Sequence, residues 1–176
     1  MRASSARRHA AAAGRALGLA GVDLAVGPAA DVGAEGAPLE DRAVANDARA
    51  VMRVVSAALR GYRRSKTIAA VGHFPGQGSA AGNPDSEPAP VGQSLDELRT
   101  RDLRPFQAVV RTAPVLVASN AIYAAFDGAT PAVLLPEAVD GLLRGRLGYR
   151  GVVMSDDLLA AGATMHTDIG PTAVEA

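Results

Sequence analysis

Carboxyl groups with the potential for acid and base chemistry follow short apolar segments of the sequence. Asp156 comes directly after the apolar segment 151–155, and Asp85 and Glu87 lie in a Gly- and Pro-rich stretch that follows the apolar segment 67–71. Two carboxyl groups across a cleft are what glycoside hydrolysis needs, one as nucleophile and one as acid/base. A separation of about 5–5.5 Å between them would indicate retention of configuration. Asp156 alone is equally compatible with a helix N-cap or an ion pair.

A phosphate-binding loop and a metal site fit the sequence less well. Gly76-Gln77-Gly78 follows an apolar segment, but the proline-rich stretch behind it does not open a helix, and no Walker lysine is present. The three histidines lie far apart, at positions 9, 73 and 166, without the spacing of metal ligands. Asp156 and Asp157 with Asp85 offer oxygens to a hard cation, but adjacent strand-end residues point in different directions. With no cysteine in the chain, a thiolate zinc site is excluded. Glycoside hydrolysis by two carboxyl groups implies no metal and no organic cofactor.

The elements that must position these residues alternate between apolar strands and helices. The apolar segments 22–26, 67–71, 115–119 and 151–155 predict four strands. Helical spacing of apolar residues predicts helices over 44–60 and 102–112, where Asp102 is the expected N-cap. An alanine-rich composition predicts a helix over 5–19, and Pro136 in a first turn predicts one over 136–147. This alternation is typical of a parallel α/β sheet, and strands that are apolar throughout are expected when helices cover both of its faces.

Functional sites in such sheets form at the carboxyl ends of the strands. We therefore expect a site from the polar residues that follow the predicted strands, which are Asp31, His73, Ser119, Asn120, Tyr123, Asp156 and Asp157. This convergence predicts a place for the chemistry and leaves the reaction open.

Composition bounds the class of protein. The 176 residues suffice for one domain with a real core, and 48% of them are hydrophobic. A formal net charge of zero argues against a nucleic-acid partner, and no apolar run is long enough for a membrane span. Arg15 and Asp23 interrupt the apolar N-terminal region, which favours a helix and strand over a signal peptide. The compartment stays open, with the cytoplasm slightly favoured.

The order and spacing of motifs over roughly residues 15–163 resemble the catalytic barrel of glycoside hydrolase family 3, and in particular its bacterial β-N-acetylhexosaminidase branch. The motifs that carry the resemblance include the segment 17–32, Glu40-Asp41-Arg42, Gly72-His73-Phe74-Pro75-Gly76-Gln77-Gly78, Asp85-Ser86, Asp102-Leu103-Arg104-Pro105-Phe106 and Gly151-Val152-Val153-Met154-Ser155-Asp156-Asp157-Leu158. The His-Phe-Pro-Gly and Ser-Asp-Asp-Leu motifs together are specific.

The resemblance implies a role for each matching position. It makes Asp156 the nucleophile and places Arg42 and His73 where family members hold the sugar hydroxyls. Asp85 matches the Asp of the family's Asp-Ser-His motif, whose His is the acid/base and whose Asp is its partner. The implied activity is that of a retaining exo-β-glycosidase acting on a carbohydrate substrate, such as a β-N-acetylglucosaminide.

The sequence departs from the family pattern at site positions. Gly72 replaces the Lys of a Lys-His pair, Gln77 and Asn120 each replace a His, and Glu87 replaces the catalytic His. Glu87 can serve as an acid if burial or neighbouring carboxylates raise its pKa, or it can be a solvated loop residue. These departures support a second hypothesis, that of an inactive, truncated homologue that binds sugar weakly or acts as a partner for another chain. An unrelated small-molecule site on a doubly wound sheet is a third.

The fold implied by the resemblance is a partial (β/α)₈ barrel. A complete barrel needs about 250 residues and eight strands, whereas four consecutive βα units are expected here. We expect a single family-like domain over residues 1–176 that is incomplete at both ends. A half barrel leaves two open sheet edges, which favour self-association.

Overall fold

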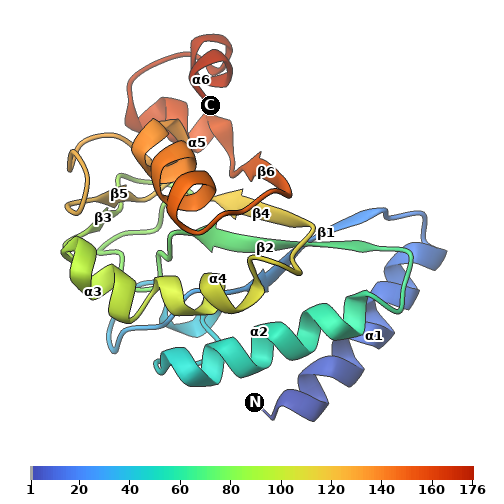
Figure 1. Cartoon of the computed structure of the whole chain (residues 1–176). Helices are drawn as coiled ribbons and strands as arrows, with labels where there is room; N and C mark the ends of the chain where they lie inside the picture. Colours follow the sequence, from blue (N-terminus) through green and yellow to red (C-terminus); the bar gives the residue numbers. More distant parts are fainter. Residues whose placement is uncertain (1) are drawn as a thin grey trace.

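The computed structural model describes residues 2–176, apart from the side chains at positions 40 and 162–164. Its main sheet contains four parallel strands in the order β1-β2-β4-β6 (Figure 1). These strands are β1 (Leu24–Ala29), β2 (Ile68–Phe74), β4 (Val115–Ala118) and β6 (Val152–Ser155). They correspond to the four predicted strands, and they confirm the expectation of a parallel α/β sheet. The sheet is not closed into a barrel, and β1 and β6 are its outer strands.

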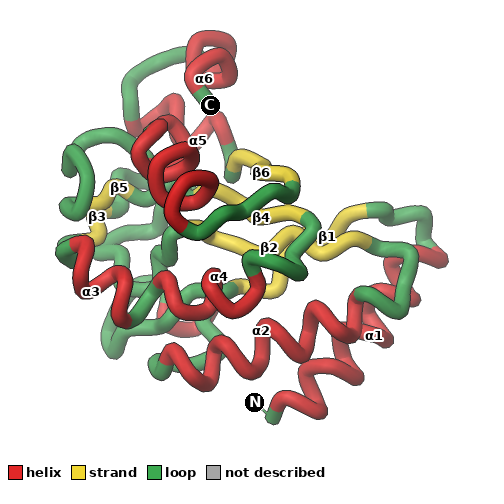
Figure 2. Tube along the Cα trace, viewed as in Figure 1, coloured by secondary structure: helices red, strands yellow, loops and turns green. Residues whose placement is uncertain are grey.

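Helices connect the strands and cover one face of the sheet. α1 (Ala3–Leu19) precedes β1 and lies beside α2 (Ala48–Tyr62), as Figure 2 shows. α4 (Leu103–Val109) and the π-helical segment η3 (Glu137–Arg146) follow, and α5 (Leu158–Thr164) and α6 (Ile169–Glu175) come after β6. Apolar residues of α2, α4 and η3 share one core with the sheet residues Ala69, Val71 and Leu116.

Local capping accounts for where α2 begins and corrects the expectation for α4. The side chain of Asp47 accepts a hydrogen bond from the backbone N–H of Ala50, which satisfies a free donor at the start of α2. Asp102 was expected to cap α4 in the same way but makes no capping hydrogen bond. Its carboxylate is fully buried and instead accepts from Arg101 and from the Gln93 amide.

The Gly- and Pro-rich stretch that follows β2 contains a further short strand, and a further helix precedes α4. β3 (Pro90–Val91) pairs with β5 (Ile122–Tyr123) in a small second sheet. α3 (Leu95–Thr100) begins with a capping box, in which Ser94 and Glu97 exchange side-chain and backbone hydrogen bonds. A short helical turn η2 (Ala132–Leu134) leads from β5 towards η3, and η1 (Glu40–Arg42) lies between β1 and α2.

The second face of the sheet is only partly covered, which corrects the expectation that helices cover both faces. Strand register places alternate residues on this open face, namely Leu24, Val26, Ile68, Ala70, Val115, Val117, Val152 and Met154. Ala70 and Val117 at its centre are fully buried, whereas Val26 is 65% and Val152 is 60% exposed on the outer strands. In a parallel barrel this face is buried only when the barrel closes, so a half barrel leaves its outer strands in water.

Among the residues that the structure describes, none of the helices combines the length and the apolarity that a membrane crossing requires.

Candidate active site

The carboxyl ends of β1, β2 and β6 bring Asp31, His73 and Asp156 together. His73 Nδ1 lies 2.8 Å from Asp31 Oδ2, and His73 Nε2 lies 3.8 Å from Asp156 Oδ2. His73 therefore stands between two carboxylates that come from different strands. This is the convergence that the parallel sheet predicts for strand-end residues.

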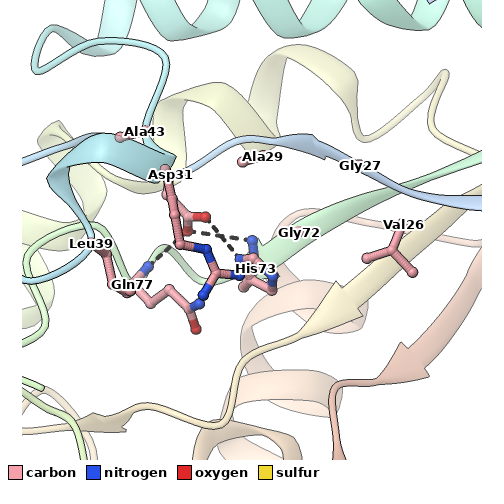
Figure 3. Close-up of a pocket in the computed structure, with 10 residues that line it drawn as sticks. Val26, Gly27, Ala29, Asp31, Leu39, Ala43, Gly72, His73 and Gln77 are labelled. Carbon is pink, nitrogen blue, oxygen red and sulfur yellow. Dashed lines mark hydrogen bonds and ion pairs between the residues drawn. The ribbon is translucent and has the colours of Figure 1, made fainter. Parts of the chain in front are cut away.

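Asp31 fixes the orientation of His73. Its Oδ1 accepts hydrogen bonds from the backbone N–H groups of His73 and Gln77, at 3.3 and 2.9 Å, as Figure 3 shows. Burial lowers the pKa of His73, but the hydrogen bond to Asp31 and the charges of Asp31 and Asp156 outweigh it, so the pKa is raised. The sequence identified Asp31 only as a polar residue after a strand, and its pairing with His73 carried no sequence signal.

One oxygen of the Asp156 carboxylate accepts a hydrogen bond, and the other does not. Oδ1 accepts from the backbone N–H of Asp157 at 3.0 Å, whereas the buried Oδ2 has no hydrogen-bond partner. Burial raises the pKa of Asp156, and the nearby charge of His73 opposes this shift. Because a buried carboxylate oxygen without a donor is costly, its presence at a strand end favours a functional explanation.

Arg42 and Asp85 form an ion pair at the rim of the same site. Arg42 Nη1 lies 2.7 Å from Asp85 Oδ2, and both side chains are almost half exposed. Arg42 ends η1 and lines a cavity of about 150 Å³ together with Asp31, His73 and the β1 residues Val26, Gly27 and Ala29. A cationic donor and an imidazole facing one cavity are suited to hydroxyl groups of a sugar.

Glu87 lies on the same loop as Asp85 but is not part of the Asp156 cluster. Its side chain is exposed, and its Oε1 accepts a hydrogen bond from the backbone N–H of Asn83 within the loop. It lines a separate depression of about 330 Å³ with Asp85, Ser86 and Asp157. The structure thus brings Asp156, His73, Arg42 and Asp85 together and leaves Glu87 beside them.

Comparison with known proteins identifies the family. The family described as "Glycosyl hydrolase family 3 N terminal domain" matches residues 2–176. The chain belongs to glycosyl hydrolase family 3. This agrees with the resemblance of the sequence motifs.

Relatives within glycosyl hydrolase family 3 include bacterial hexosaminidases. A "Beta-hexosaminidase" of Stenotrophomonas maltophilia (strain K279a) is 34% identical over 154 residues, which are 87% of this chain and 46% of that protein. A solved family 3 β-N-acetylglucosaminidase from Paenibacillus sp. str. FPU-7 is 29% identical with a TM-score of 0.89, over 98% of this chain and 34% of that one. The β-N-acetylhexosaminidase of Beutenbergia cavernae DSM 12333 is 27% identical with a TM-score of 0.88, over 99% of this chain and 54% of that one. The chain spans about half the length of the curated relatives it matches.

At two of its departures from the family 3 motifs, positions 77 and 120, the replacing side chains are buried. Gln77 is buried, and its Oε1 accepts a hydrogen bond of 2.6 Å from Ser119 Oγ. The Tyr123 hydroxyl donates to the Gly76 carbonyl, and burial raises the pKa of Tyr123 well above its usual value. Asn120 donates through Nδ2 to the Asp157 carbonyl, and its buried Oδ1 has no partner.

The departures at positions 72 and 87 instead line the two cavities. Gly72 brings no cation to the cavity that it lines with His73. In the part of the chain that the structure describes, no three His, Asp or Glu side chains gather as a metal site.

Proposed function

We propose that the chain forms the catalytic face of a retaining exo-β-glycosidase that hydrolyses β-N-acetylglucosaminide-type substrates. Asp156 is the nucleophile, Glu87 is the acid/base with Asp85 as its partner, and Arg42 and His73 hold sugar hydroxyls. The named activities of the family 3 relatives support the substrate class. The chemistry needs no metal or organic cofactor, since two carboxyl groups suffice for it.

The observation that carries the proposal is the unpartnered Oδ2 of Asp156. This oxygen is buried and lies 3.8 Å from His73 Nε2. It accepts no hydrogen bond that would lower its nucleophilicity. A carboxylate oxygen held in this way is available to attack an anomeric carbon. The charges of His73 and Arg42 oppose the effect of burial on the pKa of Asp156 and so favour its reactive, ionised form.

The acid/base role of Glu87 requires the loop to swing towards Asp156. The contact that holds the Glu87 carboxyl is one hydrogen bond of 3.2 Å to the exposed Asn83 backbone, which is a weak restraint. Asp85 on the same loop already reaches the rim through Arg42. Substrate bound between these residues supplies the contacts that reposition the loop.

A covalent trap tests this proposal directly. A slow-turnover fluorinated N-acetylglucosaminide or glucoside is incubated with the chain, and intact mass followed by peptide mapping locates any adduct. We expect an adduct on Asp156 that is absent from Asp156→Asn and retained in the neighbouring control Asp157→Asn. With aryl glycosides, Asp156→Asn should lower turnover by about 10³-fold or more. Turnover that Asp156→Asn leaves unchanged excludes Asp156 as nucleophile.

Stability provides a second readout of the Asp156 site. Because the pKa of Asp156 is raised in the folded state, its ionised carboxylate destabilises the fold. This cost sets in as pH rises from the unfolded pKa through the folded pKa, and it is complete above both. Asp156→Asn should therefore raise the free energy of unfolding at pH 7 more than at pH 4, as urea titrations at both values can measure. An equal change at both values would mean that Asp156 carries no desolvated charge.

The exposed position of Glu87 favours a second candidate, sugar binding without turnover. In that case NMR titration with N-acetylglucosamine shifts the His73 signals, while no adduct forms on Asp156. Arg42→Ala should weaken this binding, since Arg42 lines the same cavity as His73. An adduct on Asp156 decides against this candidate.

A further inference from the structure

We propose that the open face of the sheet is the interface with a second copy of the chain, and that two copies close one eight-stranded parallel barrel. The main sheet provides four parallel strands, which is half of the eight that a closed barrel of this kind requires. In the described part of the chain, no further strand pairs with the outer edges of β1 and β6. This inference is independent of the catalytic proposal.

Strand direction makes the two edges complementary. A two-fold axis along the barrel axis keeps every strand pointing the same way, so β6 of one copy lies parallel to β1 of the other at both seams. The two-fold rotation gives a closed dimer, so neither sheet edge remains free to bind a third copy. Open edges are otherwise sites of uncontrolled association.

The side chains on the open face match a barrel interior. Leu24, Val26, Ile68 and Val152 are 36%, 65%, 45% and 60% exposed, and all four are aliphatic. They belong to the same face as the buried cluster of Ala70, Val115 and Val117. Inside such barrels each layer takes four side chains from alternate strands. Two copies supply these four, from β1 and β4 of each copy or from β2 and β6 of each copy.

The size of the interface is sufficient for a stable dimer. The two strands that meet at each seam, β1 and β6, contain six and four residues, which gives seams about 13–20 Å long. Each seam is about 20 Å deep, since it passes through one sheet and one helix layer. Two seams and the inner face bury about 2,000 Å² in total, within the range of specific dimers.

Charges at the ends of the two edges are also complementary. Asp23 is exposed directly before β1, and Arg150 is exposed two residues before β6. Because the seam is parallel, the opposite charges of the two copies come to the same end of it. Such a pair contributes to orientation and register more than to affinity.

Oligomeric state tests the interface. Sedimentation velocity should show a dimer at micromolar concentration for the wild-type chain. Val26→Lys and Val152→Lys should each weaken the dimer by about 100-fold or more, because a charge would be buried at each seam. Val174→Lys is the matched control, since Val174 is 87% exposed on α6, and it should remain dimeric. A wild-type monomer, or open-ended growth with concentration, overturns the proposal.

Cysteine cross-linking tests the arrangement of the strands, because the native chain has no cysteine. Val152→Cys is combined with Val22→Cys, Leu24→Cys or Val26→Cys in one chain, so that a two-residue slip in register is covered. One combination should give a covalent dimer under oxidation, whereas each single variant should not. Within one copy β2 and β4 separate these positions by about 14 Å, too far for a disulfide. Dimers in which no combination cross-links overturn the parallel seam.

Discussion

Asp31 is the residue whose removal should change the ionisation of the site most clearly. The pKa of His73 is raised above its usual value, because its hydrogen bond to Asp31 and the charges of Asp31 and Asp156 outweigh the effect of burial. A raised folded-state pKa means that the protonated imidazole stabilises the fold below pH 6.5, and that this contribution is lost as pH rises through the folded value. Asp31→Asn should therefore reduce stability by about 1.5–3 kcal/mol at acidic pH and less at alkaline pH.

Urea unfolding on both sides of the titration measures this effect. The exposed Asp96, which pairs with Arg99 of its own helix, gives the control variant Asp96→Asn, whose stability should change little. An NMR titration of the His73 ring should show a lower pKa in Asp31→Asn. If the wild-type ring already titrates at its unperturbed pKa, Asp31 does not hold the charge.

At the scale of single residues, the sequence predicted which side chains reach the strand ends but not how they pair. His73 and Asp156 follow apolar strands, so their position was accessible from the pattern. The contact between Asp31 and His73 spans 42 positions, and strand order alone decides it. The orientation of Glu87 depends on a hydrogen bond inside its own loop, which no pattern of residue types encodes.

At the scale of elements, α3 depends on its capping box. The Ser94 hydroxyl accepts from the Glu97 backbone, and the Glu97 carboxylate accepts from both the hydroxyl and the backbone of Ser94. These bonds lower the pKa of Glu97, so their contribution is present above the unfolded pKa and is lost as pH falls through the folded one. Ser94→Ala should cost about 1 kcal/mol of unfolding free energy at neutral pH, and Ser94→Thr much less. Urea denaturation compares the three proteins, and equal midpoints would mean that the cap contributes nothing.

The contact between α1 and α2 depends on Gly61. A Cβ at this position would lie 2.5 Å from the Arg7 carbonyl oxygen and 2.8 Å from the Ala10 Cβ, which leaves no space for a methyl group. Gly61→Ala should therefore destabilise the protein by about 1–3 kcal/mol, although alanine is the better helix former. Gly141→Ala is the matched control in η3, because its nearest neighbour lies at an ordinary 3.9 Å. Thermal unfolding should separate the two variants, and a stabilised Gly61→Ala would show that the helices can move apart.

Element prediction succeeded where apolar runs were long and failed where they were short. The four main strands follow from apolar runs, α2 and α4 from the helical spacing of apolar residues, and α1 from its alanine-rich composition. β3 and β5 contain two residues each and have no period to detect. The start of α3 was encoded by Ser94 and Glu97, three positions apart, a signature that the hydrophobic pattern alone did not reveal.

At the scale of the whole molecule, the strand count limits what one copy can bury. The sequence predicted four parallel strands and open edges, and the structure has both. What the pattern could not predict is which face stays in water, because apolar strands look the same whether one face or both are covered. The exposed aliphatic side chains on β1, β2 and β6 resolve this, since they all lie on the open face.

The proposed dimer makes a prediction about charge that separates it from nonspecific apolar association. Arg150→Glu places like charges at each seam beside Asp23 and should weaken the dimer several-fold at low salt. Asp23→Lys should do the same, whereas the two changes together restore opposite charges and should recover wild-type affinity. Arg150 also donates to the carbonyls of Arg144 and Tyr149, so the recovery in the double variant distinguishes the seam from a local effect. Sedimentation equilibrium at low and high salt measures these affinities, and differences between the variants should disappear as salt screens the pair. A double variant that stays as weak as Arg150→Glu would mean that Asp23 and Arg150 do not meet across the interface.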